Sequence, residues 1–91
     1  MAITLDPPLL ARYTGRYEIA PGLVIGVDQE GDVLTAQMAG EAKAEIFAES
    51  ATTFFFKIVD ARIEFVLDGS GQVTGLVFQQ GAQSYPGKKI S

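Results

Sequence analysis

Neither cysteine nor histidine occurs anywhere in this sequence of 91 residues. Without cysteine the chain has no disulfide, no thiolate nucleophile and no thiolate metal ligand. Without histidine it lacks the commonest general base, the commonest transition-metal ligand and the usual partner of a nucleophilic serine. Most hydrolase mechanisms are thereby excluded, and we predict that the chain is not itself an enzyme and holds no metal or other cofactor.

Long apolar segments are missing as well. No apolar run approaches the roughly 20 residues that a membrane-spanning helix needs, and even the run at residues 54–56 is followed by Lys57. The first residues lack the basic start and apolar middle of a secretory signal. We therefore expect a soluble chain without membrane insertion. Its compartment stays open, because a parent protein could carry an export signal outside this sequence.

Charge and composition indicate a globular domain that does not bind nucleic acid. Net charge at pH 7 is −4, and the 7 lysines and arginines are scattered along the chain. Nucleic-acid binding draws much of its affinity from the counterions that a concentrated positive face releases. Apolar residues make up 47% of the chain, which is enough for a core, so we expect residues 1–91 to form a single domain.

From Arg16 onward the apolar residues recur with a period of two, which is typical of half-buried strands. Residues 23–29 and 33–38 flank the turn Glu30-Gly31 and predict a hairpin whose apolar side chains share one face. The expected pairs are Val27 with Leu34, Ile25 with Ala36, and Leu23 with Met38.

Residues 53–59 and 62–67 predict a second hairpin about Asp60-Ala61. On its outer face, Lys57 would lie across from Glu64 as a charge pair. On its inner face, the expected pairs are Ile58 with Ile63, Phe56 with Phe65, and Phe54 with Leu67.

Three shorter segments continue the strand pattern. Residues 44–48 predict a strand with Ile46 inward and Phe47 outward. Residues 73–79 predict another, with a bulge at Gly75 that would bring Val73, Leu76 and Phe78 onto one face. Residues 85–90 predict a last short strand.

A single helical turn is expected before the strands. Asp6 can cap it and Pro7 suits its first turn, and Leu9 and Leu10 would then cover one end of the strands that follow. The seven or eight short strands, at about 8–12-residue spacing, are joined by turns too short for helical crossovers. A sandwich and an up-and-down barrel both fit. The all-β antiparallel barrel is favoured because the connections are successive hairpins.

A series of short motifs follows in a fixed order along the chain. The motifs are Tyr13-Thr14-Gly15-Arg16-Tyr17, Pro21-Gly22, Glu30-Gly31-Asp32-x-Leu34, Phe47-x-Glu49-Ser50, Phe54-Phe55, Asp60-Ala61, Gly71-x-Val73-x-Gly75-Leu76 and Gln79-x-Gly81. In this order they resemble the small lipocalin-like domain of unknown function found at the carboxyl end of serine hydrolases of the β-lactamase and penicillin-binding-protein type. The resemblance runs over residues 9–90, with Ala48 where a proline is common and Gln80 where an asparagine is common. The resemblance implies an eight-stranded barrel with an accessory role, the hydrolytic residues lying in a separate catalytic domain.

Two sets of side chains are candidates for function. Phe47, Phe55 and Val66 are expected to point outward, and an outward apolar patch usually marks an interface. The other set points inward, where eight strands enclose just enough space for side chains or for one small ligand. These cavity candidates are Tyr17, Ile25, Val27, Leu34, Ala36, Phe54, Phe56, Phe65 and Phe78.

The two sets correspond to two functions. The first is a non-catalytic accessory domain that docks on a hydrolase or self-associates as a homo-oligomer through the outward patch. The second is a carrier that binds a small apolar ligand inside the barrel. A patch buried between chains would favour the first, and a connected cavity lined by Tyr17, Ile25, Phe56 and Phe65 would favour the second.

Overall fold

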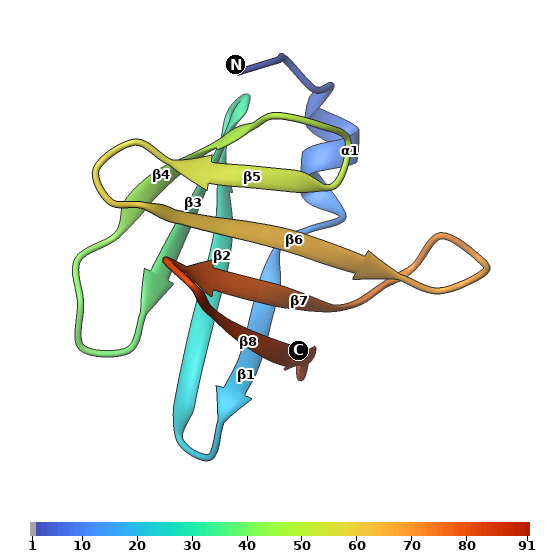
Figure 1. Cartoon of the computed structure of the whole chain (residues 1–91). Coiled ribbons are helices and arrows are strands. Elements are labelled where there is room, and N and C mark those ends of the chain that lie inside the picture. The colour runs from blue at the N-terminus through green and yellow to red at the C-terminus, as the bar shows by residue number, and fades with distance from the viewer. Residues whose placement is uncertain (1) are drawn as a thin grey trace.

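The computed structural model describes residues 2–91 as one short helix and eight strands. Each strand pairs antiparallel with the next, and the last strand also pairs with the first, so the sheet closes into a barrel (Figure 1). The predicted up-and-down barrel with one helical turn is thus confirmed. The elements are α1 (Pro7–Ala11), β1 (Gly15–Ala20), β2 (Leu23–Glu30), β3 (Val33–Met38), β4 (Ala44–Ala48), β5 (Thr53–Phe56), β6 (Ala61–Leu67), β7 (Val73–Gln80) and β8 (Gln83–Lys89).

The first hairpin differs from its predicted register by two residues. Ile25 pairs with Met38 and Val27 with Ala36, because the turn is formed by Gly31 and Asp32 rather than by Glu30 and Gly31. An even shift keeps every side chain on its face of the sheet. The predicted inward residues Ile25, Val27 and Ala36 are accordingly buried.

The second hairpin differs by four residues, and its loop is longer than predicted. Phe54 pairs with Ile63, because β5 ends at Phe56 and residues 57–60 form a loop. The expected pair of Lys57 with Glu64 does not form, since Glu64 lies opposite Thr53 on β5.

The loop also changes the place of Ile58. That side chain was expected inside the barrel, and it is 77% exposed. Phe54, Ile63 and Phe65 are buried as expected, and Phe56 is partly buried.

The remaining strands follow the predicted pattern closely. β4 has the expected bounds, with Ile46 buried and Phe47 half-buried on the outer face. In β7 the bulge falls one residue before the expected position: Val66 pairs with Gly75 and Leu67 with Val73, which leaves Thr74 as the extra residue.

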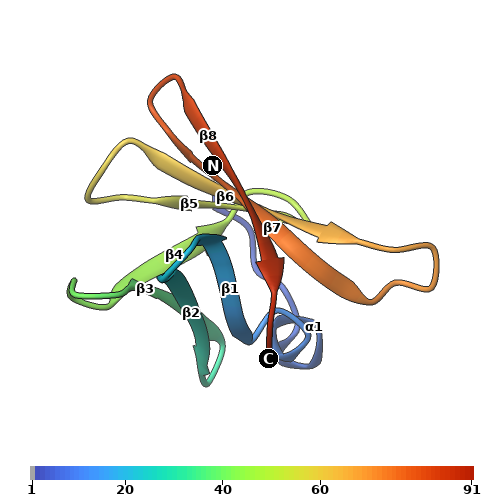
Figure 2. The ribbon, with the colours of Figure 1, turned by 90° about the horizontal axis from the view of Figure 1, so that it is seen from below.

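The helix closes one end of the barrel, which we call the helix end. Leu10 is buried, and Leu9 packs partly buried against the core. The side chain of Asp6 makes no capping hydrogen bond, contrary to expectation; its backbone carbonyl accepts hydrogen bonds from the N–H groups of Leu9 and Leu10 instead. Figure 2 shows α1 well away from the turns that join β5 to β6 and β7 to β8. Those turns lie at the opposite end, which we call the far end.

Candidate functional site

Aromatic side chains fill the barrel interior toward the helix end. The ring of Tyr13 stacks on Phe65 at a centroid distance of 4.2 Å, and Phe54 meets Phe65 edge-on at 5.5 Å. Tyr17 approaches Phe65 edge-on at 5.8 Å. Such contacts stabilise a packed core. The aromatic rings therefore fill the part of the barrel interior where a bound ligand was the alternative prediction.

The hydroxyl groups of the two buried tyrosines are both hydrogen-bonded. Tyr17 donates to the backbone carbonyl of Tyr13 at 2.7 Å, and Tyr13 donates to the carbonyl of Ala51 in the β4–β5 loop. Burial raises the pKa of Tyr17 far above its ordinary value. Burial also raises the pKa of Tyr13, against the opposing effect of the Arg12 charge. Both phenols are therefore neutral hydrogen-bond donors that hold the helix end together.

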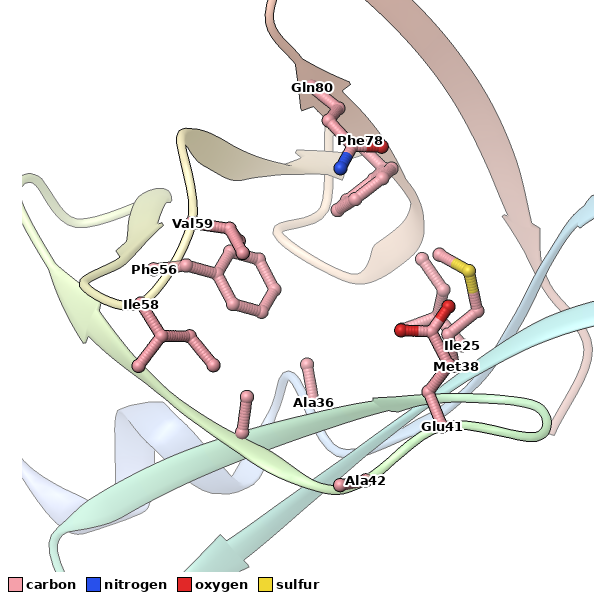
Figure 3. Close-up of a pocket in the computed structure, with 11 residues that line it drawn as sticks. Ile25, Ala36, Met38, Glu41, Ala42, Phe56, Ile58, Val59, Phe78 and Gln80 are labelled. Atoms are coloured by element: carbon pink, nitrogen blue, oxygen red, sulfur yellow. The ribbon is translucent and has the colours of Figure 1, made fainter.

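The far end of the barrel contains a pocket of about 150 Å³. It lies between the β3–β4 loop, the β5–β6 loop and the end of β7. Figure 3 shows the rings of Phe56 and Phe78 facing this hollow, with Ile58 at its edge. The lining residues are Ile25, Ala36, Met38, Glu41, Ala42, Ala44, Phe56, Ile58, Val59, Phe78 and Gln80.

The cavity candidates from the sequence divide between this pocket and the packed interior. Four of them line the pocket, namely Ile25, Ala36, Phe56 and Phe78. Leu34 and Phe54 border a smaller hollow of about 110 Å³ beneath residues 3–5. The other three, Tyr17, Val27 and Phe65, lie in the core cluster. The structure does not have the expected cavity lined jointly by Tyr17, Ile25, Phe56 and Phe65. Ile25 and Phe56 line the far-end pocket, whereas Tyr17 and Phe65 contact each other in the packed interior toward the helix end.

Several pocket residues were missed by reasoning from the sequence. Met38 was placed on the inner face by the two-residue period but was not named as a cavity candidate, and Ala44 lies on β4 at a position that the same period could have assigned. Glu41 and Ala42 lie in the β3–β4 loop, where no period exists, and Val59 was predicted as the end of a strand but lies in the β5–β6 loop. Their position depends on the register of the two hairpins, which the pattern did not determine.

Two polar groups border the otherwise apolar pocket. These are the carboxylate of Glu41 and the side-chain amide of Gln80. In residues 2–91 the ion pairs are Lys43 with Glu30 at 3.0 Å and Arg62 with Glu49 at 2.8 Å, so Glu41 takes part in neither. The pocket can therefore bind a ligand whose apolar part covers the apolar walls, and Glu41 places one negative charge at the rim.

The outward aromatic residues form a pair on the barrel wall. Phe47 on β4 and Phe55 on β5 are direct cross-strand partners, with ring centroids 5.8 Å apart. The ammonium of Lys57 lies 4.1 Å from the centroid of the Phe47 ring. On the other side Phe55 pairs with Arg62, whose guanidinium bonds Glu49. We call Phe47 and Phe55, with Lys57, Arg62 and Glu49 around them, the wall patch.

Val66 does not belong to the wall patch. The predicted register placed it opposite Phe55, but the observed register places it opposite Gly75, four residues beyond Arg62 on β6. Its side chain is 43% exposed. The structure thus brings together two of the three interface candidates.

Between residues 2 and 91, no three or more Asp and Glu side chains are grouped closely enough to hold a metal ion. Over the same range the helix α1 has 5 residues, and no helix has the length and apolar character needed to cross a membrane.

A closed eight-stranded barrel, plugged by a helix at one end and hollowed by an apolar pocket at the other, defines a small β-barrel domain. The chain belongs to the family described as Domain of unknown function (DUF3471), which matches residues 1–89. It is also 27% identical over 79 residues to Penicillin-binding protein 4* of Bacillus subtilis (strain 168). That similarity covers 87% of this chain and 18% of the Bacillus protein, so the chain spans less than a fifth of its relative's length.

Proposed function

We propose that this chain is a non-catalytic, lipocalin-like accessory domain that docks on a serine hydrolase domain of the penicillin-binding-protein type. The similarity to the Bacillus protein supports the accessory role, because it covers most of this chain and a small part of that larger protein. The composition agrees, since a chain without cysteine and histidine lacks the usual nucleophile–base pairs.

The observation that carries the docking surface is the pairing of Phe47 with Phe55 on the outer wall. Both rings are half-buried rather than covered. Aromatic residues at the centre of a surface, with charged groups around them, are the usual composition of an interface hot spot. Lys57 and the Arg62–Glu49 pair supply such a rim.

Site-specific photo-crosslinking in the cells of origin tests this proposal. A benzophenone amino acid replaces Phe55, and in a matched control it replaces Val66, which is also outward and exposed but lies away from the wall patch. We expect a crosslink from position 55 to a serine hydrolase domain, in the same chain or in another, identified by peptide mass spectrometry. Position 66 should give none.

Two outcomes would overturn docking on a hydrolase. A crosslink from position 55 to a second copy of this domain would establish self-association in its place. Equal crosslinking from positions 55 and 66 would show that the wall patch has no special role.

A second function, the binding of a small ligand, is favoured by the pocket at the far end. Small eight-stranded barrels hold one small ligand where side chains leave room. In this chain the room lies next to Phe56 and Phe78 rather than in the centre of the barrel. The two functions use different surfaces, so they can be tested independently.

A further inference from the structure

We infer that the pocket at the far end is a binding site for a small cationic ligand, a primary amine carried on one aromatic ring or one branched aliphatic group. This inference rests on the second function above, ligand binding in the barrel. It names the chemical class that the pocket selects and the residues that select it.

The size of the pocket limits the ligand to about one ring. A dry apolar cavity of about 150 Å³ accepts a molecule such as benzene, and the far-end pocket has about that volume. Ligand sites for drug-sized molecules are roughly two or more times larger. The part of a ligand that enters the pocket is therefore about one ring in size, and a longer or multi-ring compound would extend past the rim into water.

The walls of the pocket are suited to an apolar, preferably aromatic body. Phe56 and Phe78 meet at nearly a right angle, with centroids 6.1 Å apart and an interplanar angle of 88°. Ile25 and Ala36 form buried parts of the wall. Aromatic rings pack well against another ring through edge or face, and their faces attract a nearby cation.

The β5–β6 loop supplies apolar surface that the fold itself leaves uncovered. Ile58 and Val59 are both exposed and both border the pocket. Because Ile58 is 77% exposed, it adds little to the core. A ligand seated against it would cover apolar surface that is otherwise in contact with water, which favours binding.

The charge at the rim selects a cation. Glu41 borders the pocket, and the two neighbouring lysines are engaged elsewhere: Lys43 pairs with Glu30, and Lys57 lies over the Phe47 ring. The net charge of the chain is −4. A ligand ammonium would thus find the Glu41 carboxylate available, and a ligand carboxylate would be repelled.

The test is a titration of the full chain with three probes of one shape, followed by backbone amide NMR shifts. The probes are benzylamine, benzyl alcohol and benzoate, which are cationic, neutral and anionic at pH 7. We expect saturable shifts at residues of the far end, with affinity decreasing in that order. The variant Glu41→Gln should weaken benzylamine binding about two- to fivefold, as is usual for an exposed ion pair, and leave benzyl alcohol unchanged.

A pair of matched variants tests the location of the site. Ile58→Ser should weaken binding of benzylamine and benzyl alcohol alike while leaving the unfolding midpoint unchanged, because the side chain is mostly exposed. Ile90→Ser is the control, since Ile90 is 50% exposed and follows the end of β8 at the helix end. It should alter neither binding nor stability.

The outcomes separate this inference from the function on which it rests. If benzylamine and benzyl alcohol bind equally and Glu41→Gln changes neither, selection of a cation is wrong while ligand binding stands. If none of the three probes gives a saturable shift, both are wrong. Saturable binding that Ile58→Ser does not weaken would place the site outside the pocket and overturn the inference.

Discussion

The hydroxyl of Tyr17 donates a 2.7 Å hydrogen bond to the backbone carbonyl of Tyr13, and both residues are buried. Tyr13 in turn donates to the carbonyl of Ala51. The two bonds join the residues after α1 to the start of β1 and to the β4–β5 loop. They explain why a helix of 5 residues, too short to be stable alone, stays in place over the barrel end.

Replacing Tyr17 by phenylalanine removes one of these bonds and leaves the carbonyl of Tyr13 buried without its partner. The expected loss is about 1–3 kcal/mol in the free energy of unfolding, because a buried unsatisfied polar group keeps its full desolvation cost. Urea denaturation followed by circular dichroism measures it. Tyr85→Phe is the control: Tyr85 is 39% exposed, and the change should stay within about 0.5 kcal/mol. Equal effects at the two positions would contradict the role given to the buried bond.

The same tyrosines predict a loss of stability at alkaline pH. Burial raises the pKa of Tyr17 and of Tyr13 above the ordinary value of 10.0, so the folded chain keeps phenol protons that the unfolded chain releases. Below about pH 10 the two tyrosines make a constant contribution to the free energy of unfolding, because they are protonated in both states. Above it the unfolded state loses protons first, and each such tyrosine lowers the free energy of unfolding by up to about 1.4 kcal/mol per pH unit until its folded pKa is reached.

Denaturation curves collected between about pH 8 and pH 12 check this prediction, because the free energy of unfolding should begin to fall near the ordinary tyrosine pKa. The Tyr17→Phe variant should show a shallower decline than the wild type, because it lacks one of the two protons involved. Identical slopes would show that Tyr17 does not control alkaline unfolding.

Gly75 on β7 is predicted to tolerate no side chain. A Cβ atom placed there would lie 2.3 Å from the backbone carbonyl oxygen of Gly87 on β8, and a backbone atom can move away only if the strand moves. Gly75→Ala should therefore cost about 1–3 kcal/mol of stability or more. At Gly69 an added Cβ meets nothing within 4 Å, so Gly69→Ala should change the unfolding midpoint little. A neutral Gly75→Ala would mean that β7 and β8 approach less closely.

Thr35 on β3 offers a stabilising substitution. It is buried although it lies on the outer face of β3, between the inward residues Leu34 and Ala36. Its Oγ1 has no hydrogen-bond partner among residues 2–91. Thr35→Val keeps the shape and the strand preference and removes an unsatisfied hydroxyl, so we expect a gain of about 1 kcal/mol. In the matched variant Thr74→Val the lost hydroxyl donates to the carbonyl of Val66, and no gain is expected. Thermal unfolding of both variants measures these changes in stability. A loss of stability in Thr35→Val would show that the Thr35 hydroxyl is hydrogen-bonded in solution.

The registers of the two hairpins show where prediction from the sequence reached its limit. Ile25, Val27, Phe54 and Ile63 were all assigned to the inner face correctly, yet both registers were displaced by an even number of residues. A period of two cannot distinguish such registers, because each of them leaves every side chain on the same face. The backbone of the turn makes the choice, and in the second hairpin the alternation of Phe54, Phe56 and Ile58 continues past the end of β5 into residues 57–60, which form a loop.

The candidate sites depended on those registers. Phe47 and Phe55 meet because they are direct partners, whereas Val66 was separated from them by the displaced pairing. Likewise the pocket combines Phe56 and Phe78 from strands with Glu41 and Ile58 from loops. No spacing along the chain connects these four residues.

The order of apolar and polar residues by itself determined that this chain forms antiparallel strands joined by short turns, and which face of most strands is buried, because burial of one face of each strand dominates the free energy. Only the tertiary structure decided which end the aromatic rings fill and which end stays hollow. That choice follows from packing the helix and its tyrosines against Phe54 and Phe65, a contact between segments far apart in the chain.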